Sequence, residues 1–92
     1  MKTILGREIP ETTRGVVYLC HIDFLIEPPK LTVFREILCE DSFHALTLYA
    51  DIPNPLSQLA YGNTYEELCK NLEILHKEME SGEWLEELIE SI

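Results

Sequence analysis

The sequence predicts one α+β domain, in which a mostly antiparallel sheet of three to four strands precedes one long helix on one face of the sheet and a short C-terminal helix. Two observations lead to this prediction. Hydropathy alternates with a period of two over much of residues 16–52, and from residue 65 apolar residues recur at helical spacing. The 92 residues, 46% of them hydrophobic, suffice for a single small domain. We divide it into an N-terminal segment (1–15), a core of sheet and helix (16–80) and an acidic amphipathic tail (81–92).

The first strand is expected over residues 16–27, VVYLCHIDFLIE. Alternate residues of a strand point to opposite faces, so one face receives Tyr18, Cys20, Ile22, Phe24 and Ile26. The opposite face receives Val17, Leu19, His21, Asp23 and Leu25. Pro28 and Pro29 end the strand, because proline cannot donate to a ladder of hydrogen bonds.

Two further β-type runs follow, LTVFREILCE at 31–40 and FHALTLYADI at 43–52. The later run alternates again, with Leu46, Leu48, Ala50 and Ile52 on one face. Asp41 and Ser42 between the runs supply turn chemistry. We therefore expect these two runs to form a hairpin, followed by a proline-containing loop at 53–58 and a short strand at 59–62.

The stretch GNTYEEL at 62–68 predicts the start of a helix over 64–80. Thr64 and Glu67 match the capping box, in which the threonine hydroxyl accepts from a free helix N–H and the glutamate reaches back to the N–H of the cap residue. The helix should bury a stripe formed by Tyr65, Leu68, Cys69, Leu72, Leu75 or His76, and Met79. Gly82 is a suitable helix terminator.

The tail EWLEELIESI, residues 83–92, predicts a short amphipathic helix. Its apolar side consists of Trp84, Leu85, Leu88, Ile89 and Ile92. So short a helix must pack on another surface. One long helix covers only one face of the sheet. The apolar residues of the other face must therefore be covered by the N-terminal segment and the tail, or by a second protomer. We favour a homodimer, because a small core gains from association.

Charge and composition narrow the function classes. The net charge is −10, of which residues 66–92 carry −7. Direct binding to nucleic acid is disfavoured, because phosphate contacts require lysine and arginine. No apolar run is long enough to span a membrane, and Arg7, Glu8 and Glu11 interrupt any signal-peptide pattern, so we expect a cytoplasmic protein.

The sequence shows no catalytic or metal-binding constellation. Three cysteines (Cys20, Cys39 and Cys69) are widely spaced and lack a C-x-x-C pair, which indicates reduced, packed thiols, although one disulfide stays geometrically possible. Cys20 and His21 point to opposite faces of one strand and so cannot readily share a metal. The only aspartates (Asp23, Asp41 and Asp51) are expected on a strand, a turn and a loop. We expect no cofactor and no metal.

The order of hairpin, loop, short strand and helix start over about residues 31–80 resembles the HicB family of antitoxins. The matching residues are Asp51 and Pro53 in the loop, Gly62, Asn63 and Thr64 in the turn, and Glu66, Glu67 and Leu68 in the first helical turn. The resemblance implies a partial ribonuclease H-like fold that lacks the catalytic carboxylates. It also implies a protein that neutralises a small, basic, RNA-binding toxin, with an RNase of the HicA type as the family precedent.

Three features depart from that family. Asn54 and Pro55 stand where the family usually has glycine and often cysteine, and the strand at 16–27 precedes the family's usual first strand. Only the acidic tail 81–92 follows the long helix, where full-length HicB antitoxins have a DNA-binding domain. The resemblance thus implies a stand-alone HicB-like domain without operator binding of its own.

We therefore expect a protein-binding module that is not an enzyme. The residues expected to face the partner are Glu66, Glu73, Glu80, Glu83, Trp84, Glu86, Glu87, Leu88 and Glu90, with Trp84 and Leu88 as apolar anchors if the tail is not packed on its own core. The alternative is a regulatory or inhibitory interaction protein, either a dimeric adaptor or an acidic mimic of nucleic acid, with no toxin partner. An enzyme that uses Asp23, Asp51 or His21 is the remaining class.

Overall fold

The computed structural model describes residues 1–51 and 57–91, without the side chains of residues 57, 87, 88 and 91. The elements along the chain are β1 (Gly15–Asp23), β2 (Lys30–Cys39), α1 (Ser42–Asp51), β3 (Ser57–Tyr61), α2 (Tyr65–Ser81) and α3 (Glu83–Ser91). The three strands form an antiparallel sheet in the order β2-β1-β3. The predicted α+β class is confirmed, with three strands in the described residues.

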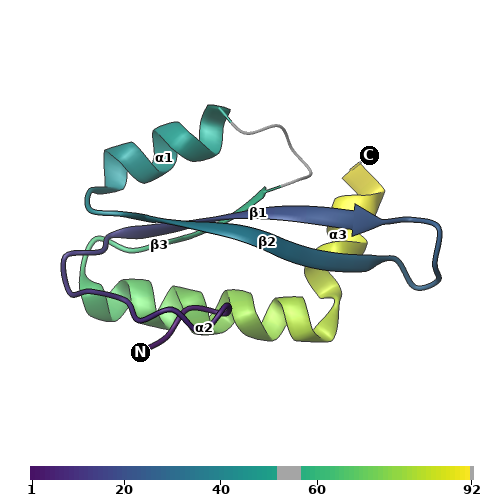
Figure 1. The fold of residues 1–92 in the computed structure, drawn as a ribbon, viewed down its shortest axis with the longest axis horizontal. Helices are drawn as coiled ribbons and strands as arrows, with labels where there is room; N and C mark the ends of the chain where they lie inside the picture. The colour runs from purple at the N-terminus through teal and green to yellow at the C-terminus, as the bar shows by residue number, and fades with distance from the viewer. Residues whose placement is uncertain (52–56, 92) are drawn as a thin grey trace.

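The molecule has three layers, and the sheet is the middle one (Figure 1). α1 lies over one face of the sheet and α2 runs along the other face, beside the N-terminal segment. α3 leaves the end of α2 near the turn of the β1–β2 hairpin. The ends of β1 and β2 therefore lie close to the junction of the last two helices.

The hairpin of the sheet is β1–β2, whose register runs from Gly15 opposite Cys39 to Asp23 opposite Lys30. The predicted hairpin of 31–40 with 43–52 is wrong. The first strand also ends earlier than predicted, at Asp23, where the side-chain Oδ1 accepts a hydrogen bond of 2.9 Å from the backbone N–H of Leu25. Residues 24–29 form the turn instead of continuing the strand.

The run 43–52 was predicted as a strand, but Ser42–Asp51 forms the helix α1, and Ile52 lies outside the described residues. Asp41 caps it, because its Oδ1 accepts from the N–H of His44 at 2.6 Å. Alanine and leucine favour a helix, and the run contains few β-branched residues. Ala45 is buried and Leu48 packs against the same cluster, which is helical spacing. The hydropathy alternation in residues 43–52, which suggested a strand, thus comes from residues that also favour a helix.

Each face of the sheet has its own apolar cluster. On the α2 face, Val16, Tyr18 and Cys20 of β1 pack with a helix stripe of Leu68, Leu72 and Leu75. On the α1 face, Val17 and Cys39 pack with Ala45. The long helix α2 covers one face, as predicted. The second face was expected to need the N-terminal segment and the tail, or a second protomer, but α1 covers part of it.

The start of α2 follows the predicted capping chemistry with one difference. Thr64 is the N-cap, and its Oγ1 accepts from the N–H of Glu67 at 3.2 Å. The Glu67 carboxylate accepts from the N–H of Asn63, one residue before the cap, at 3.2 Å. The predicted stripe is confirmed at Leu68, Leu72 and Leu75, whereas His76 is exposed. Gly82 ends the helix in the left-handed conformation, at φ 79°, as predicted.

The predicted tail helix is confirmed as α3, and it packs on the chain's own core. Trp84 is 4% exposed and packs with Ile22 of β1. Leu31, Met79 and Leu85 border this small cluster. The tail helix α3 is therefore held in place by packing against the far end of the β1–β2 hairpin as well as against α2.

Candidate functional site

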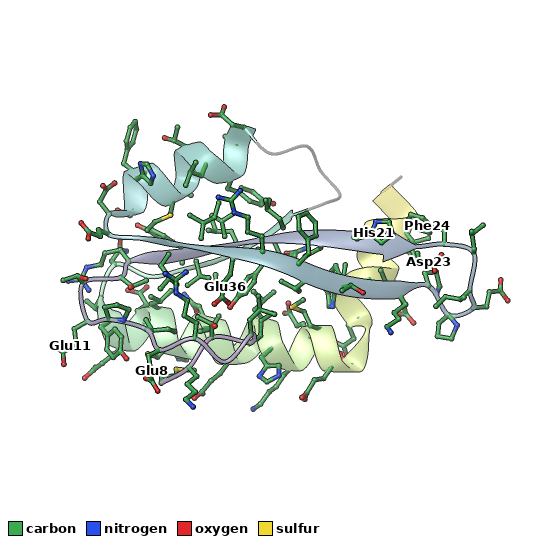
Figure 2. The ribbon with its side chains drawn as sticks, in the orientation of Figure 1. Glu8, Glu11, His21, Asp23, Phe24 and Glu36 are labelled. Atoms are coloured by element: carbon green, nitrogen blue, oxygen red, sulfur yellow. The ribbon has the colours of Figure 1, made fainter. Side chains whose placement is uncertain are left out.

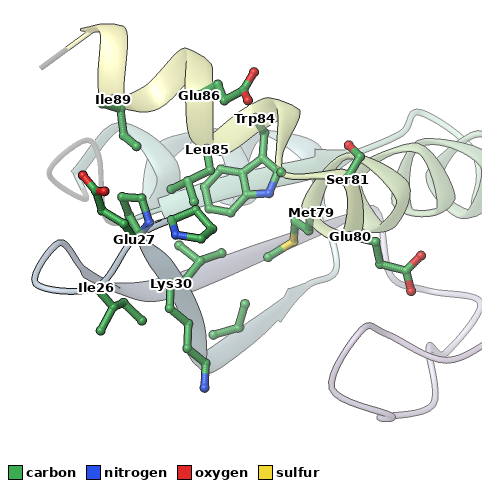
Figure 3. Close-up of a pocket in the computed structure, with 15 residues that line it drawn as sticks. Ile26, Glu27, Lys30, Met79, Glu80, Ser81, Trp84, Leu85, Glu86 and Ile89 are labelled. Carbon is green, nitrogen blue, oxygen red and sulfur yellow. The ribbon is translucent and has the colours of Figure 1, made fainter.

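A groove of about 710 Å³ lies between the end of the hairpin and the junction of α2 with α3 (Figure 3). One side comes from the hairpin turn and the start of β2, with Ile26, Pro28, Lys30 and Leu31. The other side comes from the end of α2 and from α3, with Met79, Gly82, Trp84, Leu85 and Ile89. A volume of this size is typical of binding pockets in proteins. It is the candidate binding site of this chain.

Trp84 lines the groove and carries a buried Nε1–H group that lacks a hydrogen-bond partner among the described residues. In Figure 3 its indole ring lies between Leu85 and Met79. A buried donor that stays unpaired costs about 1–3 kcal/mol. An acceptor that reached this nitrogen would recover that cost.

The hairpin turn next to the groove exposes three consecutive apolar residues. Phe24 is 51% exposed, Leu25 97% and Ile26 43%. So much exposed apolar surface in three consecutive residues is typical of an interaction site. We call these three residues the hairpin tip. Apolar surface therefore continues from the groove onto the tip.

Negative charge is concentrated around the same groove. Residues 65–77 contain three glutamates and two lysines, whereas residues 78–91 contain six glutamates and neither lysine nor arginine. The carboxylates of Glu27, Glu80 and Glu86 lie around the margin of the groove, and Lys30 is the one lysine or arginine among its described lining residues (Figure 3). His76 Nε2 lies 3.3 Å from Glu80 Oε1, one turn away on the same helix. The groove margin is thus strongly acidic.

The structure brings together only part of the predicted partner-facing set. Glu80 and Glu86 line the groove, and Glu83 and Glu90 are exposed on α3 beside it. Glu66 and Glu73 are exposed nearer the start of α2, on a stretch that also carries Lys70 and Lys77. Trp84 is buried on the chain's own core, so the condition for a surface anchor is not met. The side chains of Glu87 and Leu88 lie outside the described residues.

The sequence pattern did not indicate the hairpin side of the groove. Ile26 and Leu31 were expected within strands and Pro28 at a strand end, and Lys30 had no expected role. A signal was available, because the prolines that stop the strand force a turn, and a turn is normally polar. The apolar triplet Phe24, Leu25 and Ile26, which only Glu27 separates from Pro28, therefore marks a turn with unusually apolar surface.

Among the side chains that the structure describes, those capable of catalysis do not converge. Figure 2 shows His21, Asp23 and Phe24 at one end of the molecule and Glu8 and Glu11 at the other. Asp23 and Asp41 accept local backbone hydrogen bonds, and Asp51 is exposed at the end of α1. Within the described ranges, no three His, Cys, Asp or Glu side chains are close enough to hold a metal ion.

The buried thiols are poor nucleophiles. All three cysteines are free, and Cys20 and Cys39 are buried. Burial raises the pKa of the Cys20 thiol to about 11, and burial followed by the charge of Asp41 raises the pKa of Cys39. Both thiols are therefore protonated at neutral pH, whereas nucleophilic attack requires the thiolate. The described structure favours a packing role for them.

Comparison with protein-family models, with characterised proteins and with solved structures finds no match to this chain. Among its described helices, none is long and apolar enough to cross a membrane. The site must therefore be interpreted from its own geometry and charge.

Proposed function

We propose that this chain is a protein-binding module that docks a small basic protein through the acidic junction of α2 and α3. Its mode of action is that of an antitoxin, in which the bound chain covers the active surface of an RNA-binding toxin. The observation that carries the proposal is the concentration of six glutamates, with no lysine or arginine, in residues 78–91 beside an apolar groove.

The charge distribution supports a basic partner for a physical reason. Clustered like charges repel one another in the free chain, and a cationic surface relieves that repulsion while increasing the rate of encounter. The exposed glutamates of α3 have no cation between them in sequence, so i,i+4 pairing cannot neutralise them. A partner rich in lysine or arginine supplies the missing charge.

The family resemblance contributes less to this proposal than the charge. Its first part, a hairpin leading into the Asp51–Pro53 loop, is replaced by α1, and Pro53 lies outside the described residues. The later part corresponds to observed elements, since β3 leads through Gly62, Asn63 and Thr64 into α2. That stretch supports an antitoxin-type function by resemblance alone.

Co-expression tests the proposal directly. Each small basic protein encoded beside this chain is expressed alone and together with it, and growth and intact messenger RNA are measured. We expect the neighbour to arrest growth alone and to be neutralised by this chain in a stable complex. A neighbour that is equally toxic with and without the chain would contradict the proposal.

A second candidate, a dimeric adaptor, is favoured by the outer surface of α1. Phe43 is 79% exposed there, and Leu46 and Tyr49 are also exposed at helical spacing. Only Asp51 of the ten residues of α1 is charged. Two copies that meet through these surfaces would keep their acidic α3 helices available. The solution mass of the wild type and of the variant Phe43→Ser tests this candidate, which predicts a dimer that the substitution dissociates.

A further inference from the structure

We infer that the groove binds an amphipathic basic helix of the partner, which inserts apolar side chains between the hairpin tip and Trp84 and places lysine or arginine against the acidic margin. This inference rests on the proposed function and deepens it, since it names the docking surface and the chemistry of the segment that fills it.

The apolar part of the argument comes from the shape of the site. Leu31, Met79 and Leu85 form an apolar floor around Trp84, and the tip residues Phe24, Leu25 and Ile26 extend the apolar surface out of the groove. This surface is longer than the groove itself, so a small ligand held in the groove would leave the tip uncovered. A helix that lays an apolar stripe into a hydrophobic groove covers both.

The charges identify the sign of that helix. Glu27 stands on the hairpin side of the groove, and Glu80 and Glu86 stand on the helical side. Lys30, the one lysine or arginine among the described lining residues, does not balance them. A helix with lysine or arginine beside its apolar stripe meets carboxylates on both sides, whereas an acidic helix is repelled from both.

The unpaired Trp84 Nε1–H supplies an independent reason for an occupant. Side chains around it close it off from water in the free chain, so it has no acceptor there. In the proposed complex, the side chains around this nitrogen move apart and a polar side chain on the buried stripe of the docked helix accepts from it. Since Trp84 is the only tryptophan, its fluorescence reports this event without a label.

The experiment uses the whole chain and a synthetic helical peptide with leucine along one face and lysine along the other. Binding is followed by the anisotropy of the labelled peptide and, separately, by the emission of Trp84. We expect saturable binding with a change in Trp84 emission. A peptide of the same composition with a scrambled sequence, which has no apolar stripe, should bind at least about fivefold more weakly.

Variants locate the binding surface. Leu25→Ser with Ile26→Ser, and separately Glu80→Gln with Glu86→Gln, should each weaken binding at least about fivefold. The matched controls are Leu5→Ser, an exposed apolar residue on the N-terminal segment, and Glu8→Gln with Glu11→Gln on the same segment. These controls should bind like the wild type, and circular dichroism confirms that every variant is folded.

Three outcomes would overturn the inference. Binding that leaves Trp84 emission and the tip variants unaffected would place the partner elsewhere on the acidic surface, and the proposed function would survive. Absence of peptide binding would remove the groove as a docking site and leave the co-expression test to decide the function. Self-association that the tip substitutions abolish would assign the groove to a second copy of this chain.

Discussion

Gly15 of β1 lies directly against Ala45 of α1, so closely that a Cβ atom on Gly15 would overlap the Cβ of Ala45. This contact lets α1 lie flat on the second face of the sheet. Substitution of Gly15 by alanine should therefore destabilise the fold by about 1–3 kcal/mol, the usual cost of overpacking. Urea denaturation measures the change.

A double-mutant cycle separates this clash from other effects at Gly15. Ala45→Gly removes the methyl group that Gly15→Ala would strike, so the cost of Gly15→Ala should be smaller in an Ala45→Gly background. Equal costs in the two backgrounds would show that α1 does not lie against β1 at this point.

A second prediction concerns Tyr65, whose hydroxyl donates a 3.2 Å hydrogen bond to the carbonyl oxygen of Ile9. This bond ties the N-terminal segment to the first turn of α2. Tyr65→Phe should lower stability by about 1 kcal/mol and increase cleavage by trypsin after Arg7. Tyr49→Phe, on the outer surface of α1, is the control and should change neither. Unchanged cleavage in Tyr65→Phe would contradict this role.

The cap of α2 gives a third prediction. Thr64→Ala removes the acceptor for the N–H of Glu67 and should cost about 1 kcal/mol, whereas Thr64→Ser should preserve stability. The midpoint of thermal unfolding followed by circular dichroism tests this pair. Equal losses for alanine and serine would point to packing of the threonine methyl group instead.

Alkaline conditions test the burial of Cys20. The pKa of its thiol rises from 9.0 to about 11 because burial penalises the thiolate. The folded state thus holds this proton more tightly than the unfolded chain. The protonated Cys20 thiol therefore contributes fully to the free energy of unfolding below pH 9, and this contribution is lost as the pH rises towards 11. The free energy of unfolding should fall across this window, and less steeply in Cys20→Ala. An equally steep fall in that variant would contradict the assignment.

The same burial predicts the order of thiol reactivity. At pH 8 the partly buried Cys69 should react with a disulfide reagent before the fully buried Cys20 and Cys39. In denaturant all three should react together. Simultaneous reaction of three thiols in the native protein would show that the two buried sites open readily.

The elements with redundant local signals were predictable from the sequence, and those set by tertiary contacts were not. α2 has a cap at Thr64, an apolar stripe and a terminating Gly82, and each of these signals agrees with the others. The alternation in 43–52 fits a strand equally well, and only the small residues at Gly15 and Ala45 show that a helix can lie there. That pairing joins residues 30 positions apart, so no local pattern contains it.

The candidate site shows the same division. Its charge was visible in the sequence, because glutamates dominate the last residues of the chain. Its apolar half was not, since the groove exists only where the hairpin turn meets the junction of α2 and α3. The sequence left open whether Trp84 faces a partner or the chain's own core, because amphipathicity gives the apolar side of a helix but not what that side contacts.

Association kinetics with the basic partner test the central claim most directly. The rate constant is measured at low salt for the wild type, for Glu80→Gln/Glu83→Gln/Glu86→Gln at the junction, and for the matched Glu8→Gln/Glu11→Gln/Glu40→Gln. If the acidic junction steers the partner, the junction variant should associate about tenfold more slowly than the wild type. Added salt should reduce this difference. The matched variant should associate at nearly the wild-type rate. Equal slowing of the two variants would contradict the account, because it would mean that net charge, and not this surface, attracts the partner.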